Sequence, residues 1–147
     1  MKRFLLAVAM TTSLSMAWAQ NYNNGENLSR FVTSDQFASM TPEQLQPIEK
    51  KIQAHLDKCV AGTIKQLQLN PKRSNVSAKQ VQEHYRLWKP YYKSVCDVYA
   101  TEQEDGLAAR EALKMRCEVF SQSSFYSNLL AYQHAPVQEC QSSNAME

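Results

Sequence analysis

Residues 77–99, SAKQVQEHYRLWKPYYKSVCDVY, decide the fold of this chain. Ser77 and Gln80 have the spacing of a capping box, the side-chain pair that closes a helix N-terminus. Apolar residues then recur three or four positions apart, as on one face of a helix, at Val81, Tyr85, Trp88, Tyr92, Val95 or Cys96, and Tyr99. Pro90 lies inside this pattern, but the period continues in phase on both sides, so we expect a kink and not a helix end. The stretch therefore predicts one long helix with an aromatic spine.

A second long helix is predicted before it. Thr41-Pro42-Glu43-Gln44 combines an N-cap threonine, a proline at the first helical position and a glutamine three residues after the cap. Apolar positions follow with helical spacing at Leu45, Ile48, Ile52, Leu56, Cys59, Thr63 or Ile64, and Leu67. Pro47, within the first two turns, is expected to loosen the start. Residues 70–76 break the period with a proline and two asparagines, and we expect an exposed connection there.

A third helix is predicted after an acidic turn at residues 100–106. The helical period resumes at Leu107 and runs through Arg110, Leu113, Cys117, Phe120, Phe125, Leu129 and Leu130. The serines at 121, 123 and 124 leave open a break within this helix. The predicted fold is all-α: a small bundle of about three main helices in a single domain, residues 41–147, with a polar C-terminal tail. Residues 20–40 are expected to be a flexible polar segment that touches the core through Phe31, Val32 and Phe37.

Composition narrows the class of protein. The chain has 147 residues, 44% of them hydrophobic and only three of them glycine, which fits one compact domain and argues against phosphate-binding loops. Of the 16 Lys and Arg, Lys2 and Arg3 fall in a leader, so 14 basic residues face 14 acidic ones in the rest. A strongly basic protein built for polyanions is therefore excluded. Charge is nevertheless uneven, because residues 50–93 hold ten basic and two acidic residues, whereas residues 94–147 hold three basic and eight acidic.

Residues 1–19 have the organisation of a secretory signal peptide. Lys2 and Arg3 precede a short apolar stretch that ends in Ala17-Trp18-Ala19, an A-x-A cleavage site. The apolar core is too short to span a membrane, which takes about 20 apolar residues. We expect a periplasmic or secreted protein that begins at Gln20, without membrane insertion.

The four cysteines of the exported part, Cys59, Cys96, Cys117 and Cys140, predict two disulfides in an oxidising compartment. Three pairings are possible. We favour Cys96 with Cys117, the shorter closure, and Cys59 with Cys140, which would fasten the polar tail to the helical body. The first bridge joins the end of one predicted helix to a point ten residues into the next, so it is expected only if the acidic turn between them is extended.

Catalytic and metal sites are not predicted. His55 and Cys59 share a helical face, but export makes Cys59 a disulfide partner and no third ligand follows at a diagnostic spacing. A calcium loop around Gly106 fails at Thr101 and Gln103, where an EF-hand has aspartate or asparagine, and at Ala112, where it needs a bidentate glutamate. No Gly-x-Ser-x-Gly motif is present. We expect no enzymatic activity and no cofactor.

Aromatic and basic residues alternate in the central stretch, as in single-strand nucleic-acid binders, at Tyr85, Arg86, Trp88, Lys89, Tyr91, Tyr92 and Lys93. Most of these aromatic residues belong to the apolar stripe of their own helix, and the protein is expected to be exported. We therefore expect no nucleic-acid binding. Tyr91 lies off the stripe and is expected to be exposed.

The segment from Trp88 to Cys96, followed by Gly106 and Cys117, resembles the LprI-type lysozyme-inhibitor family. The shared features are a tryptophan eight residues before a cysteine, a turn with glycine and a second cysteine about twenty residues later. The resemblance implies a small exported helical domain that binds and blocks lysozyme-type muramidases in the cell envelope. Trp88, Cys96 and Cys117 correspond to structural elements of that family, and no inhibitory residue corresponds.

Two charged segments and one aromatic residue are the candidates for contact with a protein partner. Lys72, Arg73 and Ser74 would place cationic and hydroxyl groups near the carboxyl pair of a glycosidase. The acidic turn would instead hold a cationic partner through Glu102, Glu104 and Asp105, and Tyr91 is the exposed aromatic candidate. An immunity-type or scaffold protein that binds another envelope protein is the alternative. A hydrolase would need His84, Glu102 and Arg110 to converge in one polar cleft. The oligomeric state stays open.

Overall fold

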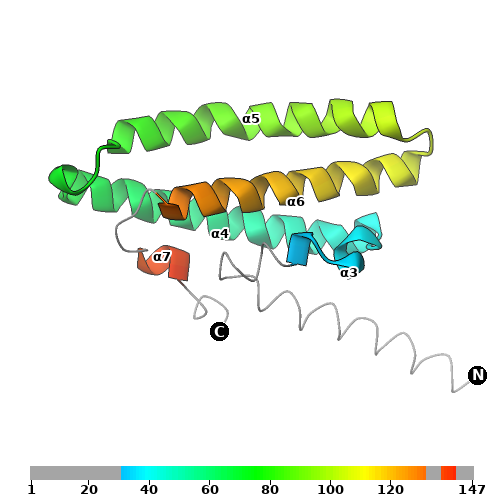
Figure 1. Ribbon diagram of the computed structural model, residues 1–147, viewed down its shortest axis with the longest axis horizontal. Helices are drawn as coiled ribbons and strands as arrows, with labels where there is room; N and C mark the ends of the chain where they lie inside the picture. Colours follow the sequence, from blue (N-terminus) through cyan, green and yellow to red (C-terminus); the bar gives the residue numbers. More distant parts are fainter. Residues whose placement is uncertain (1–30, 132–136, 142–147) are drawn as a thin grey trace, which may run out of the picture.

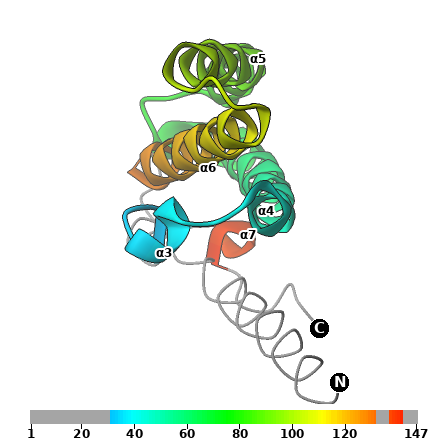
Figure 2. The same cartoon turned by 90° about the vertical axis from the view of Figure 1, so that its right-hand side faces the viewer.

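A computed structural model describes residues 31–131 and 137–141 of the protein, and these residues form helices and connections without a strand. The all-α prediction is confirmed. The helices are α3 (Asp35–Ala38), α4 (Pro42–Leu69), α5 (Ala78–Gln103), α6 (Leu107–Ala131) and α7 (Gln138–Gln141), with a 3-10 turn η1 (Pro71–Arg73) between α4 and α5. The three long helices run along the longest axis of the molecule, with α4 and α6 between α5 on one side and the short α3 and α7 on the other (Figure 1, Figure 2).

Capping signals fix where α4 and α5 begin. Thr41 and Gln44 form the predicted capping box of α4, and Ser77 and Gln80 form that of α5. In the second box the Ser77 N–H donates to Gln80 Oε1 at 2.8 Å, and the Gln80 N–H donates to Ser77 Oγ at 3.2 Å. Both proline-containing helices continue past their prolines, so neither Pro47 nor Pro90 ends its helix.

Helix α6 is continuous through its serine cluster. Gln122 and Ser123 are buried against the other helices, and the hydroxyl of Ser127 donates to the main-chain oxygen of Ser123 at 3.1 Å. A serine that bonds the carbonyl four residues earlier keeps its polar group satisfied within the helix. The break that the serines left open is therefore absent from residues 107–131.

The core lies where α4 and α6 pack together and includes Leu45, Ile52, Leu56, Val119, Phe125, Tyr126 and Leu129. The helical period overestimates the core at three positions. Tyr99, predicted on the aromatic spine of α5, is 47% exposed, and in α6 Phe120 is 53% and Leu107 81% exposed. These residues are in phase with apolar neighbours, but burial also requires a helix that faces that side.

Both favoured disulfides are confirmed. Cys59 of α4 is joined to Cys140 of α7, with Cα atoms 4.6 Å apart, and Cys96 of α5 is joined to Cys117 of α6, with Cα atoms 5.5 Å apart. The expectation of an extended acidic segment is wrong. Helix α5 continues seven residues past Cys96 to Gln103, and Cys117 lies ten residues after the start of α6. Because the two helices are antiparallel and α5 continues well past Cys96, the two cysteines face each other without an extended connection.

Residues 31–40 also differ from the flexible segment expected for residues 20–40. Phe31, Phe37 and Met40 are buried in the core, and Ser34 caps the short α3 by accepting a hydrogen bond from the Phe37 N–H at 3.2 Å. The Arg116 guanidinium donates to the main-chain oxygen of Met40 at 3.1 Å. The predicted core contacts of Phe31 and Phe37 are thus confirmed, while residues 20–30 lie outside the described part.

The C-terminal helix α7 lies against α4. Gly62 makes this approach possible, because a Cβ atom there would lie 2.8 Å from Glu139 Oε2 and 3.1 Å from Glu139 Cβ. The hydroxyl of Tyr126 donates to the main-chain oxygen of Cys140 at 2.6 Å, which fixes α7 to α6 as well. Residues 132–136 and 142–147 of the predicted polar tail lie outside the described part. Within the described residues, no helix has both the length and the apolar character needed to cross a membrane.

Candidate functional site

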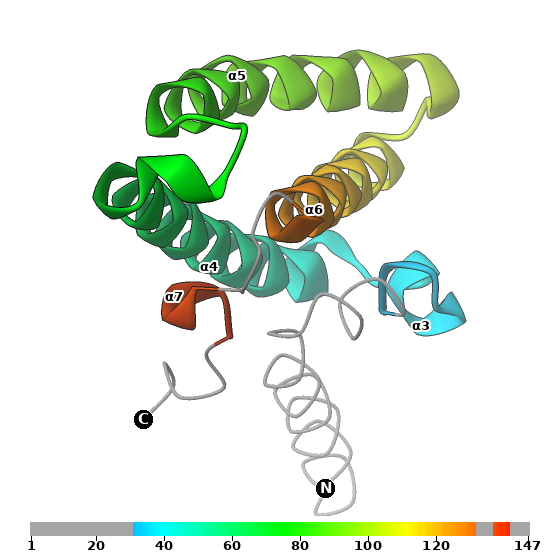
Figure 3. The same cartoon turned by 60° about the vertical axis from the view of Figure 1, so that its left-hand side comes forward.

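The two charged candidate segments lie at opposite ends of α5. Lys72, Arg73 and Ser74 lie in the connection from α4, and Glu102, Glu104 and Asp105 lie in or beside the connection to α6 (Figure 1, Figure 3). The 26 residues of α5 separate them by about 39 Å at 1.5 Å per residue. The sequence-predicted residues therefore do not form one site, and each end must be considered as a separate contact surface.

The first connection forms an exposed basic tip, which we define as residues 69–73. Lys72 is exposed in η1, and Leu69 beside it is 70% exposed. Ser74 is half-buried, and its hydroxyl accepts the Val76 N–H at 3.1 Å. Ser74 therefore helps to hold the turn in shape. The side chain of Arg73 lies outside the described part.

The second connection is shorter than predicted, because residues 100–103 belong to α5. Glu104 is the C-cap of α5, and its main-chain oxygen accepts hydrogen bonds from Arg110 Nε at 3.3 Å and Nη2 at 3.2 Å. Glu102 and Asp105 are exposed, whereas Glu104 is half-buried. The acidic end thus presents two freely exposed carboxylates on a turn that Arg110 holds in place.

Tyr91 and Glu102 are brought together on the outer side of α5. They line an open groove of about 350 Å³, together with Ser94, Val95, Val98 and Tyr99. Tyr91 is 68% exposed, which confirms its predicted exposure. The apolar character of this surface was not predicted, although the sequence carries a signal for it: Leu87, Tyr91, Val95 and Val98 recur with helical spacing beside the buried stripe.

A second open hollow of about 440 Å³ lies between α5 and α6, lined by Asp97, Leu107, Arg110, Glu111, Lys114, Met115 and Glu118. Two of its charges are paired, since Lys114 Nζ lies 2.6 Å from Asp97 Oδ1. Burial, together with the nearby Glu49 carboxylate, raises the pKa of Glu118.

The three residues that a hydrolase would need do not converge. Arg110 lines the hollow between α5 and α6, Glu102 lines the groove on the outside of α5, and His84 packs against Phe125 with ring centroids 5.2 Å apart. The arrangement of a general acid, a base and a cation in one cleft is therefore not formed by these residues.

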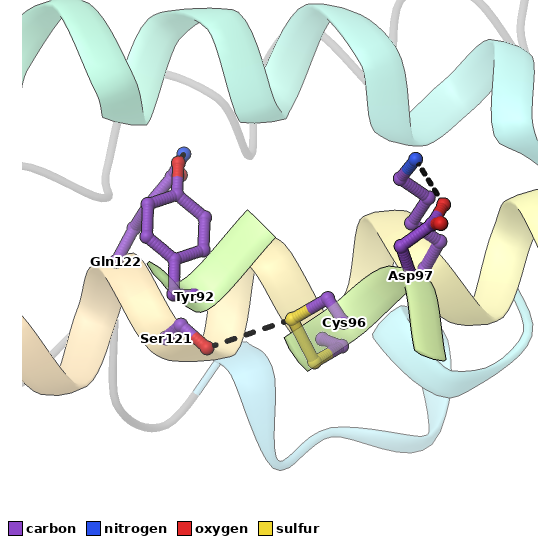
Figure 4. The surroundings of a disulfide bond; sticks show 7 residues. Tyr92, Cys96, Asp97, Ser121 and Gln122 are labelled. Carbon is purple, nitrogen blue, oxygen red and sulfur yellow. Dashed lines mark hydrogen bonds and ion pairs between the residues drawn. A yellow bond between two sulfur atoms is a disulfide. The ribbon is translucent and has the colours of Figure 1, made fainter. Parts of the chain in front are cut away.

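A buried polar network joins the three long helices, and sequence periodicity does not reveal it. Gln122 of α6 is fully buried, and its Nε2 lies 2.9 Å from Glu49 Oε1, 3.1 Å from Gln53 Oε1 and 3.1 Å from the Tyr92 hydroxyl. Figure 4 shows the ends of Tyr92 and Gln122 meeting on the side that points away from the disulfide of Cys96. Burial raises the pKa of Tyr92 to about 12, so its hydroxyl stays protonated and donates to Gln53 Oε1 at 3.0 Å.

The hydrogen-bond network continues along α4 to an ion pair between Asp57 and Lys89. Gln53 Nε2 donates to the Tyr85 hydroxyl at 2.7 Å, and that hydroxyl donates to Asp57 Oδ1 at 2.5 Å. Lys89 Nζ pairs with the same Asp57 oxygen at 3.0 Å. Burial and the Asp57 carboxylate raise the pKa of Tyr85. These contacts fix the position of α5 along α4. Tyr85, Lys89 and Tyr92, whose spacing in the sequence is similar to that of single-strand nucleic-acid binders, therefore have a structural role.

His55 is part of the packing around α7. Its ring lies against Tyr126, with centroids 5.3 Å apart, and Cys59 four residues later is in a disulfide. Within the described residues, no group of three or more His, Cys, Asp or Glu side chains is placed to hold a metal ion. Burial, with the positive charge of Lys58, lowers the pKa of His55 below its ordinary value of 6.5.

This lowered pKa predicts a pH dependence of stability. The unfolded chain takes up a proton at His55 as the pH falls through about 6.5, while the folded protein resists protonation until a lower pH. The free energy of unfolding is therefore expected to fall over that interval and to stop falling below the folded-state pKa. Urea unfolding at a series of pH values measures it, and the His55→Phe variant is expected to show a flatter profile. Parallel profiles for the two proteins would contradict the prediction.

Comparison of the chain with protein-family models, with curated proteins and with solved structures gave no significant match in any of the three. The functional argument therefore depends on the residues and geometry described above, and on the motif from Trp88 to Cys117.

Proposed function

We propose that the protein is an exported, non-enzymatic binding protein that inhibits a lysozyme-type peptidoglycan hydrolase by protein–protein contact. The observation that supports this most directly is the basic tip, an exposed turn at one end of a disulfide-linked helical body. The signal-peptide pattern of residues 1–19 and the two disulfides support a periplasmic or secreted location. The resemblance of the Trp88 to Cys117 segment to LprI-type inhibitors supports the choice of target.

The shape of the tip suits insertion into an enzyme cleft. Leu69, Asn70, Pro71 and Lys72 are all exposed. The chain re-enters the body at once, because Val76 packs against the core and Ser77 begins the capping box of α5. A turn that is already ordered loses little conformational entropy on binding, so more of its contact energy appears as affinity.

The charge of the tip suits the chemistry of the target. Glycosidases of the lysozyme type cleave with a pair of carboxyl groups, one of which carries a negative charge in the resting enzyme. The Lys72 ammonium and the Arg73 guanidinium would be attracted to that carboxylate, and the adjacent Leu69 and Pro71 would exclude water from it. Lys58 and Lys65 of the C-terminal half of α4 and Lys72 of the turn bring three lysines to this end of the molecule, which adds long-range attraction.

The acidic end is the second contact surface considered. Glu102 and Asp105 would attract a cationic enzyme surface, but they lie about 39 Å from the tip along α5. One hydrolase cleft cannot receive both ends, so the inhibitory contact is assigned to the tip alone.

Replacing Lys72 and Arg73 together by alanine is expected to weaken binding to the target hydrolase about tenfold or more, since both cations are lost from the centre of the contact. The oxidised protein is first used to capture a hydrolase from a panel of lysozymes and an envelope extract. Affinity is then measured by surface plasmon resonance, and inhibition by a muramidase lysis assay.

The matched control is Glu102→Ala with Asp105→Ala, which removes two exposed charges at the other end of α5. Its affinity is expected to stay within about twofold of the wild-type value. Unchanged affinity of the Lys72 and Arg73 variant, or a larger loss in the acidic control, would reject the tip as the contact. Capture of a different envelope protein without any effect on lysis would replace the proposed function with the immunity-type or scaffold alternative.

A further inference from the structure

The polar network between the three long helices contains a buried acceptor that lacks a donor. The side chain of Gln122 is fully buried, and its Oε1 atom has no hydrogen-bond partner within the described part of the chain. Turning the amide over would not help, because its Nε2 lies 2.9 Å from Glu49 Oε1 and 3.1 Å from Gln53 Oε1, and both of these oxygens are acceptors. A buried polar atom without a partner costs free energy, so Gln122 Oε1 requires a donor.

The carboxyl group of Glu118 is placed to supply that donor. Glu118 precedes Gln122 by four residues, so the two side chains lie one turn apart on the same side of α6. Glu118 is half-buried, and among the described residues its carboxyl group has neither an ion pair nor a hydrogen bond. Lys114, one turn earlier, is already paired with Asp97 Oδ1 at 2.6 Å. A half-buried carboxyl group without a partner is more easily kept in its neutral form, which has an O–H group to donate.

The charges around Glu118 also favour its neutral form. Burial, together with the carboxylate of Glu49 on α4, raises the pKa of Glu118. Lys93 of α5 and Lys114 of α6 oppose this rise, and Asp97 of α5 adds to it, each with a smaller effect. The other charged residues that line the hollow beside Glu118 are Arg110 and Glu111.

We infer that Glu118 is a proton-binding site inside the bundle, and that its protonated carboxyl group donates a hydrogen bond to Gln122 Oε1. Uptake of the proton supplies the donor that a buried oxygen lacks, and it removes a negative charge near Glu49. Because Gln122 also bonds to Glu49 and Gln53 of α4 and to Tyr92 of α5, the added bond strengthens the place where the three long helices meet. The inference concerns the response of the fold to pH and does not depend on the proposed hydrolase.

The direction of the pH dependence follows from this assignment. The folded protein keeps the proton at Glu118 up to a higher pH than the unfolded chain, which releases it near the ordinary pKa of 4.5. Over that interval the folded state binds more protons, so the free energy of unfolding increases as the pH falls and decreases as the pH rises through the folded-state pKa. This effect is opposite in sign to the one expected at His55, so a variant at Glu118 is needed to separate the two.

The variant Glu118→Gln imitates the protonated carboxyl group, because its amide can donate to Gln122 Oε1 at every pH and carries no charge. Its midpoint of thermal unfolding is expected to exceed that of the wild type by about 4 °C at about pH 7.5. At about pH 4, where Glu118 is protonated in the wild type as well, the two midpoints are expected to agree within about 1 °C. The matched control is Glu111→Gln, which removes the same charge from an exposed residue of α6 and is expected to stay within about 1 °C of the wild type at both pH values.

Carbon NMR of the side-chain carboxyl groups tests the proton site without reference to stability. The signal that is lost in Glu118→Gln belongs to Glu118, and in the wild type it is expected to titrate with a midpoint above 4.5. The side-chain amide signals of Gln122 are expected to shift with the same midpoint, because the oxygen of that amide gains a hydrogen bond. A Glu118 midpoint at or below 4.5, or Gln122 signals that do not follow Glu118, would overturn the inference. Equal stabilisation by Glu111→Gln would also overturn it, because the gain would then be a general effect of charge.

Discussion

Replacing Cys59 and Cys140 together by alanine is expected to lower the free energy of unfolding by about 4.5 kcal/mol. The two cysteines are 81 residues apart, and in the chain-entropy model a cross-link over a loop of that length removes a large part of the freedom of the unfolded chain. Both residues are fully buried, so the substitution also leaves a small void beside α7. Urea unfolding of the oxidised variant against the oxidised wild type measures the difference.

The second disulfide is the internal control for this prediction. Cys96 and Cys117 are 21 residues apart, so their replacement by alanine is expected to cost only about 3 kcal/mol. The two variants should also differ in which helix loses protection from amide exchange. Amide exchange is expected to rise in α7 when Cys140 is replaced, because that helix has one turn and few other contacts, while α7 should stay protected when Cys96 and Cys117 are replaced. A larger loss from the shorter loop, or no change in α7, would contradict the prediction.

The parts of the fold that local sequence determines were predictable. Thr41 and Ser77 start their helices because each carries the side chains of a complete capping box within four residues. The disulfide pairing followed from loop length and from the position of Cys140 near the end of the chain. In these cases the deciding contacts lie close together in the sequence, or a covalent bond restricts the choices to three.

The parts that depend on a facing helix were not predictable. Gln122 reads as a polar surface residue, yet it is fully buried because Glu49, Gln53 and Tyr92 meet it from two other helices. Tyr99 reads as a core residue, yet it is exposed, because α5 is covered on the side of Ala100, which is fully buried, and not on the side of Tyr99. Residue types and their helical period predict which face of a helix is apolar. Whether another element covers that face depends on tertiary packing.

In the candidate site, too, local sequence predicted the exposure of single residues, and tertiary packing decided how they are grouped. The sequence identified Lys72, Tyr91 and Glu102 as exposed, and all three are exposed in the structure. Their grouping required the three-dimensional arrangement: Tyr91 and Glu102 share one groove, while Lys72 lies at the far end of α5. Ser74 shows the limit of residue-type reasoning, because its hydroxyl is already used by the N–H of Val76.

Replacing Trp88 by alanine is expected to destabilise the protein by about 3 kcal/mol, at the lower end of the range for large-to-small aromatic changes because Trp88 is half-buried. Its ring centroid lies 4.2 Å from that of Phe125 and 4.3 Å from that of Tyr92, so the substitution removes one of the aromatic contacts between α5 and α6 and opens a void beside the buried network. Thermal and urea unfolding followed by circular dichroism measure the loss. Tyr91→Ala, three residues away on the exposed side of α5, is the matched control and is expected to stay within about 0.5 kcal/mol of the wild type. Equal effects at the two positions would show that Trp88 does not hold the helices together, and would return it to the set of residues available for a ligand.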